Sequence, residues 1–194
     1  MNPRNQAGIT LVEVLVIIGV IFVLWSLSIP AVTTGPSKSI LTQSLSNMKQ
    51  LHLTCFQMAL DGETTGETNL GWPGHYTSYG AWVTNVVPAY LSTNDFCKIV
   101  SAPGLIVPSG RLPRMDATAI RLYAVGPESP TNAVLLTSAN FTNTPTGGEA
   151  LNSSAKPFGN KGFVVFRKDG SGSVMLPRQV GQTNIIGSFV PLCR

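Results

Sequence analysis

The feature that most constrains this chain is an apolar run near its start that carries a single acid. Glu13 begins this run, and no further charged residue occurs before Lys38. Residues 14–32 number 19, which as a helix is about 28 Å and matches the hydrocarbon core of a bilayer. Arg4 is the only charged side chain ahead of Glu13, so the positive-inside rule places residue 1 in the cytoplasm and the bulk of the chain outside. The run predicts a single membrane span.

Glu13 needs an explanation, because an ionised acid at the centre of a membrane helix costs roughly 2.5–3.5 kcal/mol on insertion scales. Three interpretations compete: a secretory signal peptide, a plain single-span anchor, and a leader that is cut after Gly8. An acid beside the apolar core argues against a signal peptide, which carries positive charge at that place. A plain anchor leaves Glu13 without a role.

The third interpretation is based on a resemblance. Gly8-Ile9-Thr10-Leu11-Val12-Glu13 resembles the leader of type IV prepilins and type II secretion pseudopilins. In that family a dedicated peptidase cuts after the glycine and methylates the new N-terminal residue, which here is Ile9. Glu13 lies five positions after Gly8, where the family keeps a glutamate, and Pro30 lies 22 positions after it, where the family keeps its helix-kinking proline. The chain departs from the family at Ile9, where phenylalanine is usual.

The resemblance implies a structural subunit of a bacterial filament, most consistent with a type II secretion-type system. Such a subunit starts in the inner membrane as a single-pass protein, with a cytoplasmic N-terminus and an extracytoplasmic head, and then enters the filament. Its partners are the prepilin peptidase, an inner-membrane assembly platform with its ATPase, and other pilin-like subunits. Cleavage after Gly8 creates an amine at Ile9. In a filament this amine would meet Glu13 of the next subunit in a low-dielectric environment and set the register of stacked helices.

The alternative function is a membrane-anchored extracytoplasmic enzyme or binding module that uses residues 1–32 only as an anchor. An aromatic segment, Trp72–Trp82, would then be its binding surface; the other interpretation is that these rings fold onto the core. The sequence contains no GxSxG, HExxH, P-loop or GxGxxG motif, so the prediction is that the chain is not an enzyme. The net charge of +4 comes from scattered residues rather than a basic stripe, so no nucleic-acid partner is predicted.

The predicted organisation has four parts. A leader covers residues 1–8, a transmembrane or filament-core helix residues 9–32, an amphipathic helix residues 33–61, and a loop-rich β head residues 62–194. The segment Thr33-Thr34-Gly35-Pro36 is expected to break or loosen the helix. Beyond it, one face of a helix is marked by residues at alternating spacings of four and three: Leu41, Leu45, Met48, His52, Cys55 and Ala59. Asp61-Gly62 is expected to end this helix.

The strands of the head are expected late in the chain. The runs 119–125 and 133–138 flank a Gly-Pro turn signal, and the runs 163–167 and 173–176 flank Asp169-Gly170, which predicts a hairpin. Residues 185–190 are predicted to form a last edge strand. The fold class is therefore α+β: a long N-terminal helix, with a transmembrane half and an amphipathic half, packed on a small antiparallel sheet in a pilin-like arrangement.

Few residues suggest further sites. The chain has three cysteines, so at most one intramolecular disulfide can form, and Cys97–Cys193 is the candidate that would clip the C-terminus to the body. No cofactor is predicted. The weak candidates for a calcium site are Asp61, Glu63 and Glu67, which lack EF-hand spacing.

Overall fold

The computed structural model describes residues 11–144 and 148–193, with the side chains of residues 27–37, 144 and 183 left out. The chain divides into two compact units, residues 1–38 and 39–194. The helix α1 runs from Leu11 to Thr65 without interruption, so the loosening predicted at residues 33–36 is not observed. A proline inside a helix removes a single backbone donor, which lowers stability without always ending the helix.

The prediction of a transmembrane half is wrong. Within the part of the chain that the structure describes, no helix combines the length and the apolar character needed to cross a membrane. The predicted location, a single-pass protein of the inner membrane, is overturned by the same finding.

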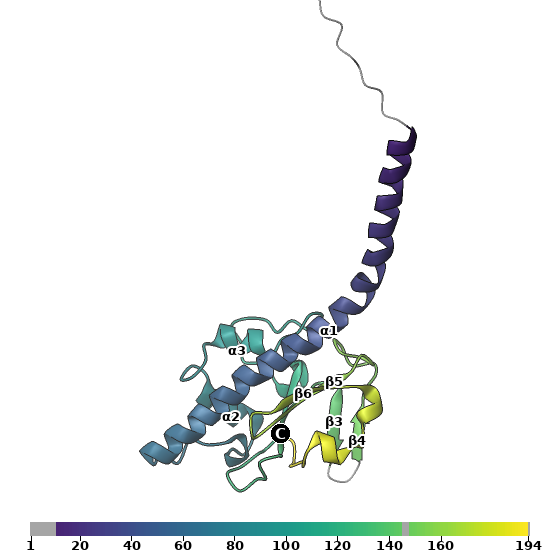
Figure 1. Ribbon diagram of the computed structural model, residues 1–194. Coiled ribbons are helices and arrows are strands. Elements are labelled where there is room, and N and C mark those ends of the chain that lie inside the picture. The colour runs from purple at the N-terminus through teal and green to yellow at the C-terminus, as the bar shows by residue number, and fades with distance from the viewer. Residues whose placement is uncertain (1–10, 145–147, 194) are drawn as a thin grey trace, which may run out of the picture. The chain divides into compact units, whose positions relative to one another are not determined.

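The second unit is an α+β head, as predicted. Its main sheet has four antiparallel strands in the order β1-β2-β5-β6 (Figure 1). Their bounds are Ile120–Leu122 for β1, Val134–Ser138 for β2, Phe163–Arg167 for β5 and Gly172–Met175 for β6. The β5–β6 pair is the hairpin expected from the sequence, and β1 and β2, which also pair, lie within the two other runs predicted as strands.

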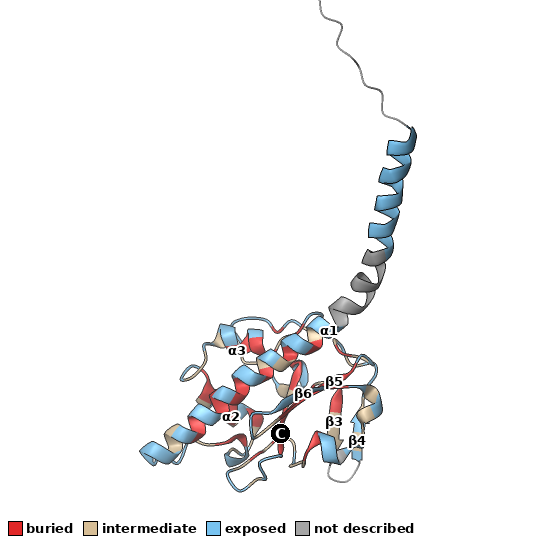
Figure 2. Cartoon of the chain, in the orientation of Figure 1, coloured by how far each residue is buried: buried red, intermediate tan, exposed pale blue. Residues whose placement is uncertain are grey.

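The head part of α1 packs on this sheet through the predicted stripe, which Figure 2 shows as a red band along the helix. Met48, Cys55 and Met58 are fully buried, and Leu41 and Leu51 nearly so. The helix ends at Thr65, a few residues later than predicted, and Gly66 follows with a φ of 72°. A residue in the left-handed region directly after a helix is a common C-terminal stop, and glycine adopts it without a steric cost.

Residues 62–118 hold more helix than the loop-rich sequence predicts. After the short 3₁₀ turn η1 (Pro73–His75) come α2 (Tyr79–Val86) and α3 (Thr93–Ile99), and a second 3₁₀ turn, η2, covers Met115–Ala117. Both α-helices begin with a serine cap. The hydroxyl of Ser78 accepts a hydrogen bond from Ala81 N, and that of Ser92 accepts one from Asp95 N.

Two features of the C-terminal half differ from the prediction. A second antiparallel pair, β3 (Phe141–Thr144) and β4 (Gly148–Leu151), was not expected. The predicted edge strand at 185–190 is wrong, because the chain there forms the one-turn helix α4 (Thr183–Ile186) after the 3₁₀ turn η3 (Pro177–Gln179). Within the described part of residues 185–190, the pairing with the sheet is an isolated bridge between Ser188 and Ala133.

Candidate functional site

The candidate site is the apolar surface that α1 exposes over residues 11–26, called the N-terminal apolar surface below. Every residue in this stretch is exposed (Figure 2). The exposed fraction of its large apolar residues ranges from 44% at Val14 to 81% at Leu11. Ser26 turns its hydroxyl inward and donates to Val23 O at 2.8 Å, so it adds little polarity. A Cβ added at Gly19 would meet no atom within 4 Å, so the helix is open to close approach at this point.

Glu13 is the one charged residue of this surface and lies in the first turn of α1. A carboxylate in the first helical turn interacts favourably with the unpaired backbone N–H groups there. The predicted cleavage residues Gly8 and Ile9 lie outside the described residues. Pro30 falls within α1, but its side chain is among those not described, so the predicted kink stays a prediction.

A smaller apolar patch lies on the head part of α1. Leu53, Phe56 and Leu60 follow one another at spacings of three and four residues, so they share one helix face. Their exposed fractions are 55%, 50% and 42%. Beneath the patch, the ring of His52 packs against Phe166, and its Nε2 lies 2.8 Å from Lys168 O. His52 therefore has a packing role with a satisfied polar atom.

The aromatic segment at 72–82 folds onto the core. Trp82 is fully buried, and Trp72 and Tyr79 are 8% exposed. The Nζ of Lys168 lies 5.6 Å from the centre of the Trp72 ring, close enough for a cation–π contact. Because Trp72, Tyr79 and Trp82 are covered, these three rings belong to the core, while His75 is exposed and Tyr76 is half-buried.

A cleft of about 470 Å³ lies between the start of α2 and residues 112–116. Its charged residues, Arg114 and Asp116, pair with each other at 3.6 Å between Nε and Oδ1. Ser78, also in the lining, uses its hydroxyl as the cap of α2. That hydroxyl is thus occupied in a structural hydrogen bond and is not set up as a nucleophile.

The three weak calcium candidates do not form one group: Glu63 and Glu67 line a common cleft, but Asp61 is not part of its lining. Both carboxylate oxygens of Asp61 accept hydrogen bonds, from Gln57 Nε2 at 2.8 Å and from Tyr90 Oη at 2.9 Å. Glu63 and Glu67 are exposed. Partial burial, and then the hydrogen bond to Asp61, raise the pKa of Tyr90 to about 12. Among the described residues no group of three or more His, Cys, Asp and Glu side chains is arranged to hold a metal ion.

All three cysteines lie in the described part and are free and buried, so the predicted Cys97–Cys193 disulfide is not observed in the structure. Cys97 and Cys193 have different surroundings. The Sγ of Cys97 donates to Arg111 O at 3.7 Å, whereas the Sγ of Cys193 lies 4.0 Å from Pro73 O. Each of the two thiols thus has a different backbone carbonyl as its hydrogen-bond partner.

Comparison with known proteins gives no relative for this chain. No family model matches it, no curated protein matches it, and no solved structure matches it.

Proposed function

We propose that the chain is a pilin-like structural subunit of a bacterial filament, of the type II secretion kind, that assembles through its N-terminal apolar surface. The occupant of this surface is the same helix of further subunits. The observation that carries the proposal is the exposure of residues 11–26, where 13 of 16 side chains are large and apolar. Burying such a surface gains about 25 cal/mol per Å² of apolar area removed from water.

Further copies of the same helix can bury this surface more completely than an unrelated partner of mixed polarity would. The surface runs around the whole helix rather than along one stripe, so a helix placed among several others can bury all of it. Gly19 supports this packing, since the absence of a side chain permits two helices to approach closely.

Glu13 gives the stack its register. Cleavage after Gly8 would free an amine at Ile9, and the amine of one subunit would pair with Glu13 of its neighbour. Away from water, this attraction is stronger than at an exposed surface, and an unpaired Glu13 would be costly there. A displacement of one helix along another would separate the charges, so the pair selects a single register.

Processing is tested by the mass of the chain recovered from cells that contain an active prepilin peptidase. We expect the mature chain to begin at Ile9 and to be about 14 Da heavier than the unmodified polypeptide, because of one methyl group. Gly8→Val should leave the leader attached. A chain that keeps its first eight residues in the presence of the active peptidase contradicts the proposal.

Assembly is tested separately with Glu13→Ala, followed by sedimentation and electron microscopy of filaments. We expect this variant to be processed like the parent chain and to be absent from filaments. Glu63→Ala is the matched control, because Glu63 is an exposed glutamate near the other end of the same helix. Normal assembly of Glu13→Ala would remove the register role, and failure of both variants would show that the effect is not specific to Glu13.

A further inference from the structure

Residues 191–193 are held against the main sheet. Cys193 N donates to Leu122 O at 2.9 Å, and Ala124 N donates to Pro191 O at 2.8 Å. Leu192 forms an antiparallel bridge with Tyr123 between these two bonds. This arrangement continues the edge of β1 and turns the side chain of Cys193 into the core, where it is 2% exposed.

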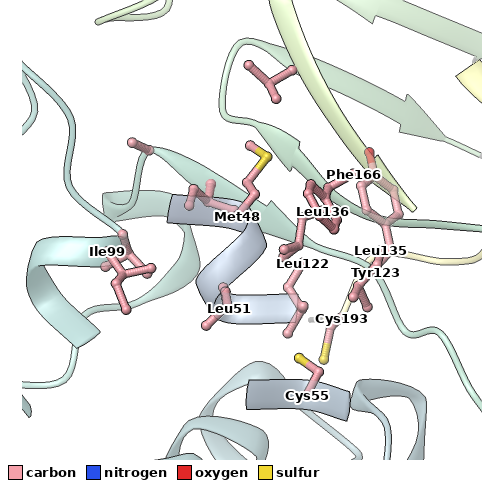
Figure 3. Close-up of a cluster of buried hydrophobic side chains, with 14 of the residues drawn as sticks. Met48, Leu51, Cys55, Ile99, Leu122, Tyr123, Leu135, Leu136, Phe166 and Cys193 are labelled. Carbon is pink, nitrogen blue, oxygen red and sulfur yellow. The ribbon is translucent and has the colours of Figure 1, made fainter. Parts of the chain in front are cut away.

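The side chain that Cys193 meets there belongs to α1. Cys55 lies on the buried stripe of the helix and is fully buried. Figure 3 shows the sulfur atoms of Cys55 and Cys193 next to each other, near the labelled residues Leu51 and Leu122. The two thiols also interact electrostatically: burial is the main cause that raises the pKa of Cys55, and the nearby Cys193 raises it further.

We propose that Cys55 and Cys193 are the site of an intramolecular disulfide that fastens the C-terminal segment to α1. The oxidant is an organic disulfide, either a small molecule or the active site of a thiol oxidoreductase. One thiolate attacks it to form a mixed disulfide and release one thiol, and the second cysteine then displaces the other thiol. Over the two steps, the two cysteines lose two protons and two electrons, and the oxidant becomes two thiols.

Burial determines when this exchange can occur. The thiolate is the reacting form, and burial raises the pKa of Cys193 to about 11 and that of Cys55 further still. In the folded head both thiols are therefore protonated near neutral pH and shielded from reagents. The bond forms while the C-terminal segment is undocked, and once the segment docks, the bond is protected from reductants.

Cys97 provides the internal control. Its thiol is also buried and donates to Arg111 O, whereas the thiol that interacts electrostatically with Cys55 is that of Cys193. Cys97→Ser should therefore leave the disulfide unchanged, whereas Cys193→Ser should abolish it. Neither residue belongs to the N-terminal apolar surface, so the inference stands or fails independently of the proposed function.

The experiment refolds the full chain from denaturant with either oxidised glutathione or a reductant. Trypsin alone is not sufficient to map the bond, because the tryptic peptide 50–98 contains both Cys55 and Cys97. Digestion with trypsin and a glutamate-specific protease separates the two at Glu63 and Glu67. We expect the non-reduced digest to link the Cys55 and Cys193 peptides, and the oxidised chain to melt about 10 °C higher than the reduced one.

Three results would overturn the inference. They are a link that includes Cys97, a link between two chains, and three thiols that all remain open to alkylation after refolding with the oxidant. The mapping uses the parent chain, so it does not depend on whether a serine variant folds. The loss of the higher melting temperature in Cys193→Ser, together with its retention in Cys97→Ser, would support the assignment.

Discussion

Among individual residues, the buried polar pair Ser138 and Asn140 does most to fix the end of the main sheet. Both are fully buried, and the hydroxyl of Ser138 donates to Asn140 Oδ1 at 2.8 Å. The amide of Asn140 donates to the carbonyls of Gly159 and Gly162, each at 2.9 Å, and Val164 N donates to Ser138 Oγ. These bonds tie the end of β2 to the segment that leads into β5, so a displaced register would leave several buried groups without partners.

Asn140→Ala should therefore lower the free energy of unfolding by about 3 kcal/mol, because it leaves the two carbonyls and the Ser138 hydroxyl without their partner. Urea unfolding of the full chain measures this change. Asn152→Ala is the control: Asn152 is exposed, and its side chain bonds only locally, as Oδ1 accepts from Ser154 N at 3.0 Å, while its backbone bond to Asn140 O is kept in the variant, so the substitution should cost less than about 1 kcal/mol. Equal effects of the two substitutions would contradict the role given to Asn140.

Local residue patterns predicted part of the cysteine pair and left the role of the aromatic segment open. The stripe position of Cys55 was readable from the sequence, because helical periodicity is local. Its neighbour in space, Cys193, was not, since the two are far apart in the chain and only the docking of the C-terminal segment brings them together. The sequence left open whether the aromatic segment is a binding surface or folds onto the core. The burial of Trp72, Tyr79 and Trp82 favours the second alternative.

At the scale of elements, the strongest local signals predicted the structure well. The β5–β6 hairpin follows from two apolar runs around a glycine turn, and Gly170 indeed has a φ of 83°. The sequence signals that failed belong to segments whose structure depends on contacts with distant parts of the chain. Residues 185–190 are apolar enough for a strand, yet the first two belong to the helical turn α4 and the rest meet the sheet at a single bridge. The β3–β4 pair has few apolar residues, so its sequence gives no clear alternation.

The contact between α1 and the hairpin depends on Gly172. A Cβ at this position would lie 2.5 Å from Leu45 Cδ1 and 2.5 Å from Phe166 Cδ2. Phe166 is almost fully buried and Leu45 is a half-buried residue packed against the core, so making room for a Cβ requires a displacement of packed side chains. The absence of a side chain at Gly172 is what allows the helix to approach the hairpin this closely.

Gly172→Ala should thus destabilise the head by about 2 kcal/mol through overpacking. Thermal unfolding by circular dichroism measures the effect. Gly126→Ala is the matched control, because a Cβ there meets nothing within 4 Å and its φ is not positive. We expect that control to change stability by less than about 0.5 kcal/mol. A neutral Gly172→Ala would show that the helix and hairpin are packed less closely than these distances indicate.

At the scale of the whole molecule, the two units differ in where their apolar residues lie. In residues 39–194 the apolar side chains gather in a continuous core between α1, the short helices and the main sheet. In residues 11–26 they are exposed along the helix. A unit with its own core is expected to fold independently, whereas a single exposed apolar helix gains its stability by packing against partners.

This division predicts the behaviour of a chain that lacks residues 1–38. We expect it to remain monomeric in size-exclusion chromatography and to unfold cooperatively, with a melting temperature within about 3 °C of the head in the full chain. The reason is that every large buried side chain identified in the structure lies at or after Leu41. The full chain, which keeps the N-terminal apolar surface, should self-associate under the same conditions.

Self-association of the shortened chain would contradict this prediction and would show that the assembly surface lies on the head, where the patch formed by Leu53, Phe56 and Leu60 is the first candidate. Triple substitution of these three residues by serine would then restore the monomer if that patch, and not the N-terminal surface, joins the subunits.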